Sequence, residues 1–462
     1  MRASLEVGNN RYSDFKEMLM SHKEIKNLLN TAIETVASVA SDYAENPGRD
    51  FSRCRNLPAD KLIEFLISEG SSTTKNELLD FFGMDIQAPS SSAFCQQREK
   101  LKPEALKKVF DVFTESVTSY DNKHPNYRFI AADGSTATFF SREKYSSHDD
   151  YFVSPGKSAK GVYSIHINAF FDLNTHMYTD AILQPIHQKD EFKAFCAIVD
   201  RHTVSPKISN VYIGDRGYCS YNNMAHVIES GQFFLFRTKD INRKGMVSNF
   251  SYPNEDSFDI TVKVSIVRSH SQKIECGDSY RRFIDAAGSF DYIEYGSKKV
   301  YPISFRVVRF PISADNYECL VTNLSADDFP LVRLKELYNT RWGIESSFRK
   351  LKYTIGLSNF HSYKPALVMQ EIWARIIAYN LTEAMINETV IKKNNRKYSY
   401  KVNFSVAAHI CRVSLRPHEK ETLVNLMQLL ARELIPIRKN RQYKRLQTAH
   451  FRRPRYFIYR AA

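Results

Sequence analysis

Apolar residues recur every three to four positions along the first quarter of the chain, which is the spacing of one helix face. The period is clearest in residues 14–44 and 57–70. Residues 72–83 and 90–101 follow it as well, and each begins with Ser or Thr, which cap helix starts. The pattern predicts an N-terminal helical domain over residues 1–120. Two roles suit such a domain: DNA binding, or a helical lid or dimerisation surface.

The apolar period becomes shorter after residue 126, and buried or alternating runs typical of β-strands appear. The first run ends in an acid, and a later pair of alternating runs flanks an Asp-Leu-Asn-Thr turn, as in a hairpin. A mixed sheet with helices packed against it is therefore the prediction for residues 121–240. In chain order, the predicted elements are a strand (127–133), a hairpin (161–184), a helix (189–203), a second strand (209–215), another helix and a third strand (231–239).

The second half of the chain alternates between strand and helix patterns. Residues 241–304 are rich in Gly, Ser, Asp and β-branched residues, which predicts a β-rich insertion. Two strands and two helices are predicted for residues 305–385, and a helical region for residues 386–462. That region ends in a tail, residues 437–460, where Arg and Lys alternate with Tyr and Phe. Such a tail suits phosphate contact with base stacking, and equally a solvated terminus.

One predicted helix, residues 337–352, carries a single carboxylate among cations. On an ideal helix four of its polar residues fall within about 60° of one another, and Arg349 joins them. An apolar stripe lies roughly 80° away, so the polar face stays accessible while the helix is buried on its other side. This arrangement suits a metal-binding acid beside a phosphate backbone; ion pairs at four-residue spacing are the structural alternative. The four residues are Tyr338, Arg341, Glu345 and Lys352.

Composition and charge narrow the class of protein. The 462 residues suffice for two or three domains, and 43% hydrophobic and 13% aromatic residues are typical of a globular protein. The net charge of +14 favours an anionic partner, most simply nucleic acid. A run of about 18 apolar residues, a secretory signal and paired CxxC cysteines are all missing from the sequence, which predicts a cytoplasmic protein with reduced thiols.

Three acids lie where a sheet edge and the basic helix can bring them together. Asp133 and Asp215 each end a predicted strand, and Glu345 lies on the helix. Three hard oxygen ligands would hold Mg²⁺ or Mn²⁺, as two ions bridged by the first Asp. Two such ions can activate a water or a 3′-hydroxyl and stabilise the leaving oxygen of a phosphodiester. Each acid also has a structural explanation: a turn at Asp133, a helix cap at Asp215 and an ion pair at Glu345.

The pattern Y-x₂-R-x₃-E-x₆-K between residues 338 and 352 matches the signature of bacterial insertion-sequence transposases of the IS-four type. The segments FIAADGST (129–136) and IGDRGY (213–218) resemble the two aspartate regions of that family, and SAFCQQREKL (92–101) resembles the segment before its catalytic core. The chain is therefore similar to this family over roughly residues 50–380.

The resemblance implies a ribonuclease-H-like catalytic core in two parts, residues 121–240 and 305–385, with a DDE triad of Asp133, Asp215 and Glu345. It also implies cleavage at transposon ends, strand transfer into target DNA, and a homodimer that holds two terminal inverted repeats. Excision through a DNA hairpin and an association with the bacterial nucleoid are expected as well. Contacts to DNA are expected from Tyr338, Arg341, Trp342, Arg349 and Lys352.

Several assignments stay open at this point. Trp342 suits two roles, stacking on a displaced base or packing in the core. Asp172, Asp180 and Asp190 are competing acids outside the matched motifs. Two other functions fit the same fold: a domesticated DNA-binding protein that does not cut, and a nuclease without strand transfer. The intact triad argues against the first, and the basic helix argues against the second.

Overall fold

The computed structural model describes residues 20–53, 57–119, 126–140, 149–153, 161–202, 208–274, 281–313, 316–391, 398–417 and 426–437. The chain divides into two compact units. The sheet unit comprises residues 123–349, and the helical unit comprises residues 1–122 and 350–462. The basic tail after residue 437 and the first 19 residues lie outside the described part of the chain.

The helical unit is built from two distant parts of the sequence. The first contributes α1 (His22–Ser38), α2 (Ala59–Ser68), α3 (Thr74–Phe81), α4 (Ser91–Arg98) and α5 (Pro103–Ser119). The second contributes a π-helix (Leu351–Ile355), α11 (Pro365–Asn387), α12 (Phe404–Ser414) and α13 (Leu426–Arg432), with the short strands β11 (Tyr400–Val402) and β12 (Leu434–Pro436).

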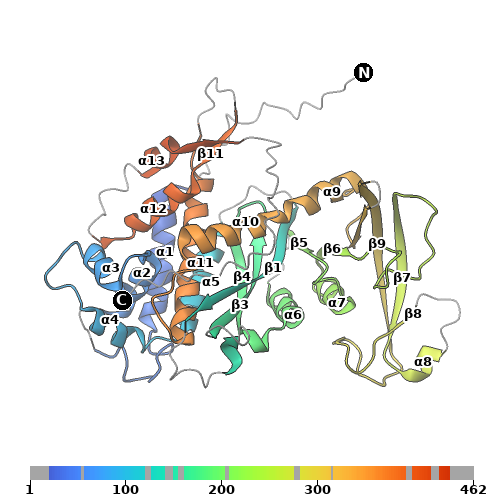
Figure 1. Cartoon of the computed structure of the whole chain (residues 1–462), viewed down its shortest axis with the longest axis horizontal. Helices are drawn as coiled ribbons and strands as arrows, with labels where there is room; N and C mark the ends of the chain where they lie inside the picture. The colour runs from blue at the N-terminus through green and yellow to red at the C-terminus, as the bar shows by residue number, and fades with distance from the viewer. Residues whose placement is uncertain are drawn as a thin grey trace. The chain divides into compact units, whose positions relative to one another are not determined.

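Helix α11 forms the centre of the helical unit. Seventeen of its 23 residues are buried, on all sides of the helix, which is how a helix surrounded by others behaves. Helices α1, α2, α5 and α12 pack against it, and α1 and α5 run beside it in Figure 1. Side-chain caps begin α3 and α4 as predicted, because Thr73 and Ser90 each accept a backbone N–H from the first turn. Ser21 caps α1 in the same way.

The sheet unit contains the remaining elements. Its strands are β1 (Tyr127–Phe139), β2 (Phe152–Val153), β3 (Val162–Asp172), β4 (Tyr178–Pro185), β5 (Ser209–Gly214), β6 (Phe233–Thr238), β7 (Phe258–Val267), β8 (Arg281–Phe283), β9 (Val300–Ser313) and β10 (Asn316–Thr322). Its helices are α6 (Glu191–Arg201), α7 (Tyr221–Glu229), α8 (His270–Ile274), α9 (Leu331–Thr340) and α10 (Trp342–Lys350), with 3₁₀ turns at Asp149–Tyr151 and Ile186–Gln188.

Among the described residues, ten strands form one mixed sheet in the order β2-β3-β1-β5-β6-β10-β9-β7-β8, with β4 also paired to β3. Strand β3 is antiparallel to β1 and β4, whereas β5 is parallel to β1 and β6 is parallel to β5. The part β4-β3-β1-β5-β6 is the ribonuclease-H-like core that the sequence predicts, and the α/β fold class is confirmed.

Helices cover both faces of this core. Side chains alternate along each strand, so Tyr212 and Phe234 face α6 and α7, while Ile213 and Leu235 face α9. Figure 1 shows α6 and α7 together beside the core strands. Each large apolar side chain buried in this way contributes about 1.5–3 kcal/mol. Packing on both faces of the sheet fixes the positions of the strands, and therefore of the residues at the strand ends.

The β-rich segment predicted for residues 241–304 supplies β7 and β8. These strands extend the core sheet, because β7 pairs with β9 and β9 pairs with β10. Strand β9 runs through residue 304, where the sequence pattern places the end of the insertion. Local composition does not reveal this continuity, because pairing between strands is a long-range property.

Candidate functional site

Strand register places Asp133 beside Asp215. The parallel pairing of β1 with β5 runs from Tyr127 opposite Ser209 to Ala131 opposite Ile213. Both aspartates come two residues after that last pair. The prediction that Asp133 ends its strand is wrong: β1 continues to Phe139, because β3 pairs with it over that whole length. The neighbouring strand β5 ends instead, so Asp133 still lies at a step in the sheet.

Helix α10 brings Glu345 to the same face. The hydroxyl groups of Tyr178 and Ser347 are hydrogen-bonded at 2.8 Å, and the ring of Phe348 lies 6.0 Å from that of Tyr178. A Cβ at Gly343 would lie 3.0 Å from Leu173, so the start of the helix sits close to the end of β3. Glu345 then accepts a hydrogen bond of 3.0 Å from the guanidinium of Arg341.

Electrostatics link the three predicted acids. Burial raises the pKa of Asp133 to about 6, and the carboxylates of Asp215 and Glu345 contribute to the increase. A hydrogen bond from the Gly134 N–H, at 2.8 Å, and the charge of Arg341 oppose it. Asp215 and Glu345 therefore each lie within electrostatic reach of Asp133, and Arg341 is a counter-ion to both Asp133 and Glu345.

The donor chemistry of this cluster fits a divalent cation. All three groups are hard oxygen ligands, and Asp133 is held where its own negative charge is unfavourable, which a cation would relieve. The carboxylate oxygens of these three acids do not all lie within 4.8 Å of one another. Among the described residues, the ligand atoms of Glu69, His361 and Glu371 in the helical unit do lie that close together. Like charges keep carboxylates apart when no cation lies between them.

The predicted basic stripe divides into buried and exposed residues. Regular α-helix is interrupted at Arg341, between α9 and α10, and gives way to the π-helix that holds Lys352, so ideal helix spacing applies only in part. Tyr338 is 3% exposed and packs against the sheet, and Arg341 is 5% exposed. Trp342 is 53% exposed, which excludes the alternative that it packs in the core. Arg349 is also exposed.

The competing acids have structural partners. Asp172 forms an ion pair with Arg128 at 2.7 Å and accepts two backbone N–H groups in the following turn. Asp180 pairs with Arg201 at 2.5 Å. Asp190 caps α6 by accepting the N–H of Lys193. These contacts account for all three acids without a metal.

Comparison with known proteins shows the family of this chain. The transposase DDE domain family matches residues 124–381, which is more than half of the chain. The chain belongs to the DDE transposase family. That range contains every acid of the predicted triad. No helix in the described part of this transposase-family chain is both long and apolar enough to cross a membrane.

Two transposases are similar to parts of this chain in sequence, and one solved structure gives a weak structural match. The putative transposase y4zB of Sinorhizobium fredii is 24% identical over 179 residues, which are 39% of this chain and 43% of that protein. The transposase InsG for insertion sequence element IS4 of Escherichia coli is 42% identical over 65 residues, 13% of this chain and 15% of that protein. The matched stretches thus span less than half of either relative. The piggyBac transposase synaptic complex with hairpin DNA gives a TM-score of 0.44 at 11% identity, over 92% of this chain and 86% of that one.

Glu191 is a further acid near Asp133 that the sequence pattern does not single out. A Cβ at Gly134 would lie 2.7 Å from its carboxylate, so Glu191 reaches the neighbour of Asp133 from the face covered by α6. His166, which is 2% exposed, donates to it at 3.1 Å, and Lys189 pairs with it at 2.8 Å. The hydrogen bond from His166 is the main cause that lowers the pKa of Glu191 to about 2. Its one local signal, an acid in the first turn of a helix, has a common structural explanation.

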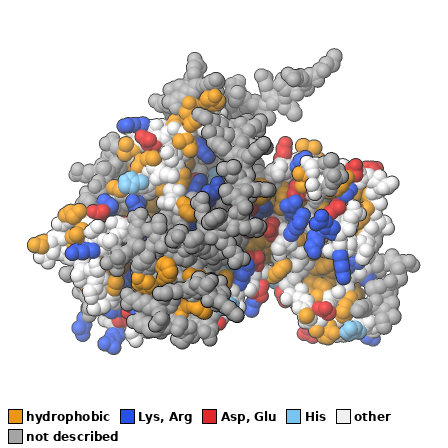
Figure 2. All heavy atoms as spheres, viewed as in Figure 1, with side chains coloured by type: hydrophobic (Ala, Val, Ile, Leu, Met, Phe, Trp, Pro, Cys, Tyr) orange, Lys and Arg blue, Asp and Glu red, His pale blue; other side chains and the backbone are white. Residues whose placement is uncertain are grey.

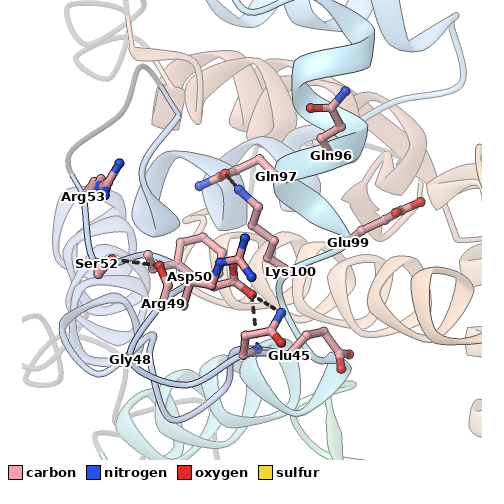
Figure 3. Close-up of a pocket in the computed structure, with 12 residues that line it drawn as sticks. Glu45, Gly48, Arg49, Asp50, Ser52, Arg53, Gln96, Gln97, Glu99 and Lys100 are labelled. Carbon is pink, nitrogen blue, oxygen red and sulfur yellow. Dashed lines mark hydrogen bonds between the residues drawn. The ribbon is translucent and has the colours of Figure 1, made fainter.

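The helical unit of this DDE transposase-family chain holds a second candidate site, a polar cavity of 680 Å³ (Figure 3). Asp50 accepts hydrogen bonds from the backbone and side chain of Asn46, which shapes its rim. Arg49 and Arg53 line it, and their guanidinium groups have no hydrogen-bond or ion-pair partner among the described residues. The lining residues are Glu45, Asn46, Gly48, Arg49, Asp50, Phe51, Ser52, Arg53, Gln96, Gln97, Glu99 and Lys100.

Proposed function

We propose that this protein is a DNA transposase that cleaves the ends of an insertion sequence and transfers the freed strands into target DNA. One observation carries the proposal: Asp133, Asp215 and Glu345 gather at one step of the core sheet, with the Arg341 guanidinium beside them. This gathering occurs in a chain of the DDE transposase family. The catalytic residues are then these three acids, and the substrate is a phosphodiester.

The three acids would hold the divalent metal ions of this chemistry, Mg²⁺ or Mn²⁺ as a pair. Such ions, when bound, supply an activated oxygen nucleophile and the positive charge that stabilises a leaving oxygen. Asp133 lies at the step beside Asp215, so the two aspartates would contribute ligands to the same ions. Arg341 is nearly buried and hydrogen-bonded to Glu345, so it would hold that carboxylate in place.

Exposed residues next to the acids supply the DNA contacts in this proposal. Trp342 and Arg349 are exposed on α10, and Trp342 presents an aromatic face on which a base can stack. The Arg341 guanidinium lies 4.9 Å from the ring of Trp342 and holds its orientation. The hydroxyl of Tyr338 is buried and lacks a hydrogen-bond partner among the described residues, so we assign Tyr338 to packing α9 against the sheet rather than to phosphate contact.

The partners that we propose are the terminal inverted repeats, the target DNA and a second copy of the chain that holds the other end. Lys and Arg side chains gather on the visible face of the sheet unit, as DNA binding requires (Figure 2). The polar cavity of the helical unit offers Arg49 and Arg53 to a phosphate, which supports a DNA-binding role for that unit. DNA binding would place the protein at the bacterial nucleoid.

The test compares Asp215→Ala with Asp327→Ala, which removes an exposed acid from the same unit. Each protein is incubated with Mg²⁺, a donor plasmid carrying the element, and a target plasmid. We expect the first variant to bind the ends normally but to lose at least about 10³-fold in cleavage, since a ligand to the activating ions is worth several kcal/mol. The control variant should cut and join like the wild type.

Three outcomes separate the proposal from its rivals. Cleavage and joining by the wild type, with neither in Asp215→Ala, support a transposase. Cleavage without joining identifies a nuclease of the same fold. End binding without cleavage in Mg²⁺ or Mn²⁺ identifies a domesticated DNA-binding protein, and retained cleavage in Asp215→Ala overturns the assignment of the triad.

A further inference from the structure

A second cluster of metal-ligand groups is buried in the helical unit. Glu69 follows α2, His361 lies between the π-helix and α11, and Glu371 is on α11. One ligand atom of each lies within 4.8 Å of the other two. The side chains of Glu69 and Glu371 are 0% and 1% exposed, and that of His361 is 5% exposed. Nothing in the proposed DNA chemistry uses these residues.

The histidine ring is held in one orientation. Its Nε2 lies 2.9 Å from the carbonyl oxygen of Ser72, which can only accept, so Nε2 carries a proton. The other ring nitrogen, Nδ1, faces the carboxylates of Glu69 and Glu371 at 3.5 Å from each. Nδ1 has no hydrogen-bond partner among the described residues. A second ring nitrogen bonded to a backbone carbonyl is the usual support of a metal-binding histidine.

Glu69 is the residue that the remaining contacts leave unexplained. Neither oxygen of its buried carboxylate accepts a hydrogen bond from the described residues. Arg375 lies nearby, but its guanidinium donates to the backbone carbonyls of Glu69 and Gly70, and its Nη2 is 4.0 Å from the Glu69 carboxylate. A buried carboxylate without a partner is strongly unfavourable, so a cation or a proton must lie beside it.

Glu371 is fixed by neighbours on both sides. Its Oε1 accepts a hydrogen bond from Arg98 at 2.9 Å, and its Oε2 accepts the backbone N–H of His361 at 3.0 Å. The same Oε2 is the atom 3.5 Å from Nδ1. Separations of 3.5 Å are long for a hydrogen bond. They are close to the distance between two ligand atoms of a tetrahedral zinc ion, which is about 3.3 Å for zinc–ligand bonds of 2.0–2.1 Å.

We propose that Glu69, His361 and Glu371 bind a structural divalent transition-metal ion, for which Zn²⁺ is the best match. One imidazole and two carboxylates are ligands that Zn²⁺ accepts, and the second free oxygen of Glu69 completes four-coordination. The ion would join α2 to α11 and to the segment after the π-helix. Ser72 and His361 are 289 residues apart, so this contact joins the two distant parts of the sequence that build the helical unit.

A proton on Nδ1 of His361 is the alternative to a metal ion between this ring and the carboxylates of Glu69 and Glu371. Burial alone would lower the pKa of His361, but Glu69 and Glu371 raise it to about 9 when no metal is present. Arg98 and Arg375 already bring two positive charges to the cluster, and they favour this smaller occupant. A metal ion and a proton on Nδ1 exclude each other, so metal binding would release a proton and would weaken as the pH falls.

The experiment uses full-length Asp215→Ala protein, so that metal bound at the proposed catalytic acids contributes less to the measured zinc content. The protein is stripped with a chelator, supplied with Zn²⁺, desalted and analysed by mass spectrometry for metal content. We expect one zinc per chain, and an unfolding midpoint raised by roughly 5–10 °C. Adding Glu69→Gln should abolish zinc retention, whereas Glu64→Gln, on the same stretch of chain but outside the cluster, should retain one zinc per chain.

X-ray absorption at the zinc edge tests the ligands without relying on the Glu69→Gln variant to fold. One nitrogen and two or three oxygens at about 2.0–2.1 Å would support the site. Less than a tenth of a zinc per folded chain, zinc retained by folded Glu69→Gln, or sulfur ligands would overturn it in favour of the proton. The result does not depend on DNA cleavage, so failure of the transposase proposal and failure of the zinc site are separately visible.

Discussion

The acids at the step of the sheet and the acids buried in the helical unit show opposite ways of placing carboxylates in one chain. Asp133 and Glu345 share the guanidinium of Arg341, and the pKa of Asp133 is raised to about 6 by burial and by the carboxylates of Asp215 and Glu345. In the helical unit, Arg98 and His361 surround Glu371 and lower its pKa to about 2 despite its burial. The first group is therefore short of positive charge, whereas in the second group Glu371 has positive charge built in beside it and Glu69 accepts no hydrogen bond from the described residues.

This difference indicates different purposes. A site that must bind and release metal and substrate has unfavourable charge when empty, and such sites reduce stability. A site that holds a fold together satisfies its charges with protein groups or a resident ion. Removing the charge of Asp133 should therefore stabilise the fold, whereas removing the charge of Glu371 should destabilise it. That contrast in sign can be measured.

Asp133→Asn should give the largest effect on activity. We expect cleavage to fall by at least about 10³-fold, and the metal-free protein to become more stable by about 1–3 kcal/mol at pH 8, allowing for solvent screening of a half-buried group. The sign follows from linkage. The pKa of Asp133 is raised from 3.8 to about 6 on folding, so its stabilising contribution is present below pH 4 and lost as the pH rises through 6.

Urea unfolding in a chelator at pH 3.5–4 and at pH 8 measures this contribution. The stability difference between variant and wild type should be present at pH 8 and vanish at the lower pH. Magnesium should stabilise the wild type much more than the variant. A variant that is less stable than the wild type at pH 8 would show that Asp133 is a structural acid.

Glu371→Gln should change stability in the opposite direction. The neutral amide leaves the buried guanidinium of Arg98 without its counter-ion, which costs about 3–5 kcal/mol. The matched control is Glu99→Gln, which breaks an exposed ion pair with Lys364 in the same unit and should cost less than about 1 kcal/mol. Urea unfolding of the three proteins gives both values, and equal costs for the two variants would remove the contrast between the clusters.

The sequence predicts the sheet step better than the helical cluster, for physical reasons. The strand patterns around Asp133 and Asp215 are local, and the helix signature identifies Glu345, so all three acids can be found before any contact is known. Nothing local marks Glu69 or His361, because each is remote in sequence from its partners. Glu191 is hidden for a different reason, since an acid at the start of a helix has an ordinary local explanation. The extension of β1 past Asp133 and the π-helix at Lys352 depend on long-range packing, which local periodicity does not contain.

Gly134→Ala should have the smallest of these effects. It tests whether Glu191 and His166, which pack against Gly134, hold the neighbouring Asp133 in place. Alanine normally improves a strand, but here its Cβ would lie 2.7 Å from the Glu191 carboxylate and 2.8 Å from the ring of buried His166. We expect a loss of about 1–3 kcal/mol from overpacking, and a 10- to 100-fold loss of cleavage because Asp133 is displaced with its neighbour. Gly245→Ala, whose Cβ would meet atoms no closer than 3.5 Å, is the control. If Gly134→Ala has the same stability and the same cleavage activity as that control, the side chains of Glu191 and His166 move aside without cost. The rigidity of the acid cluster must then come from α10 alone.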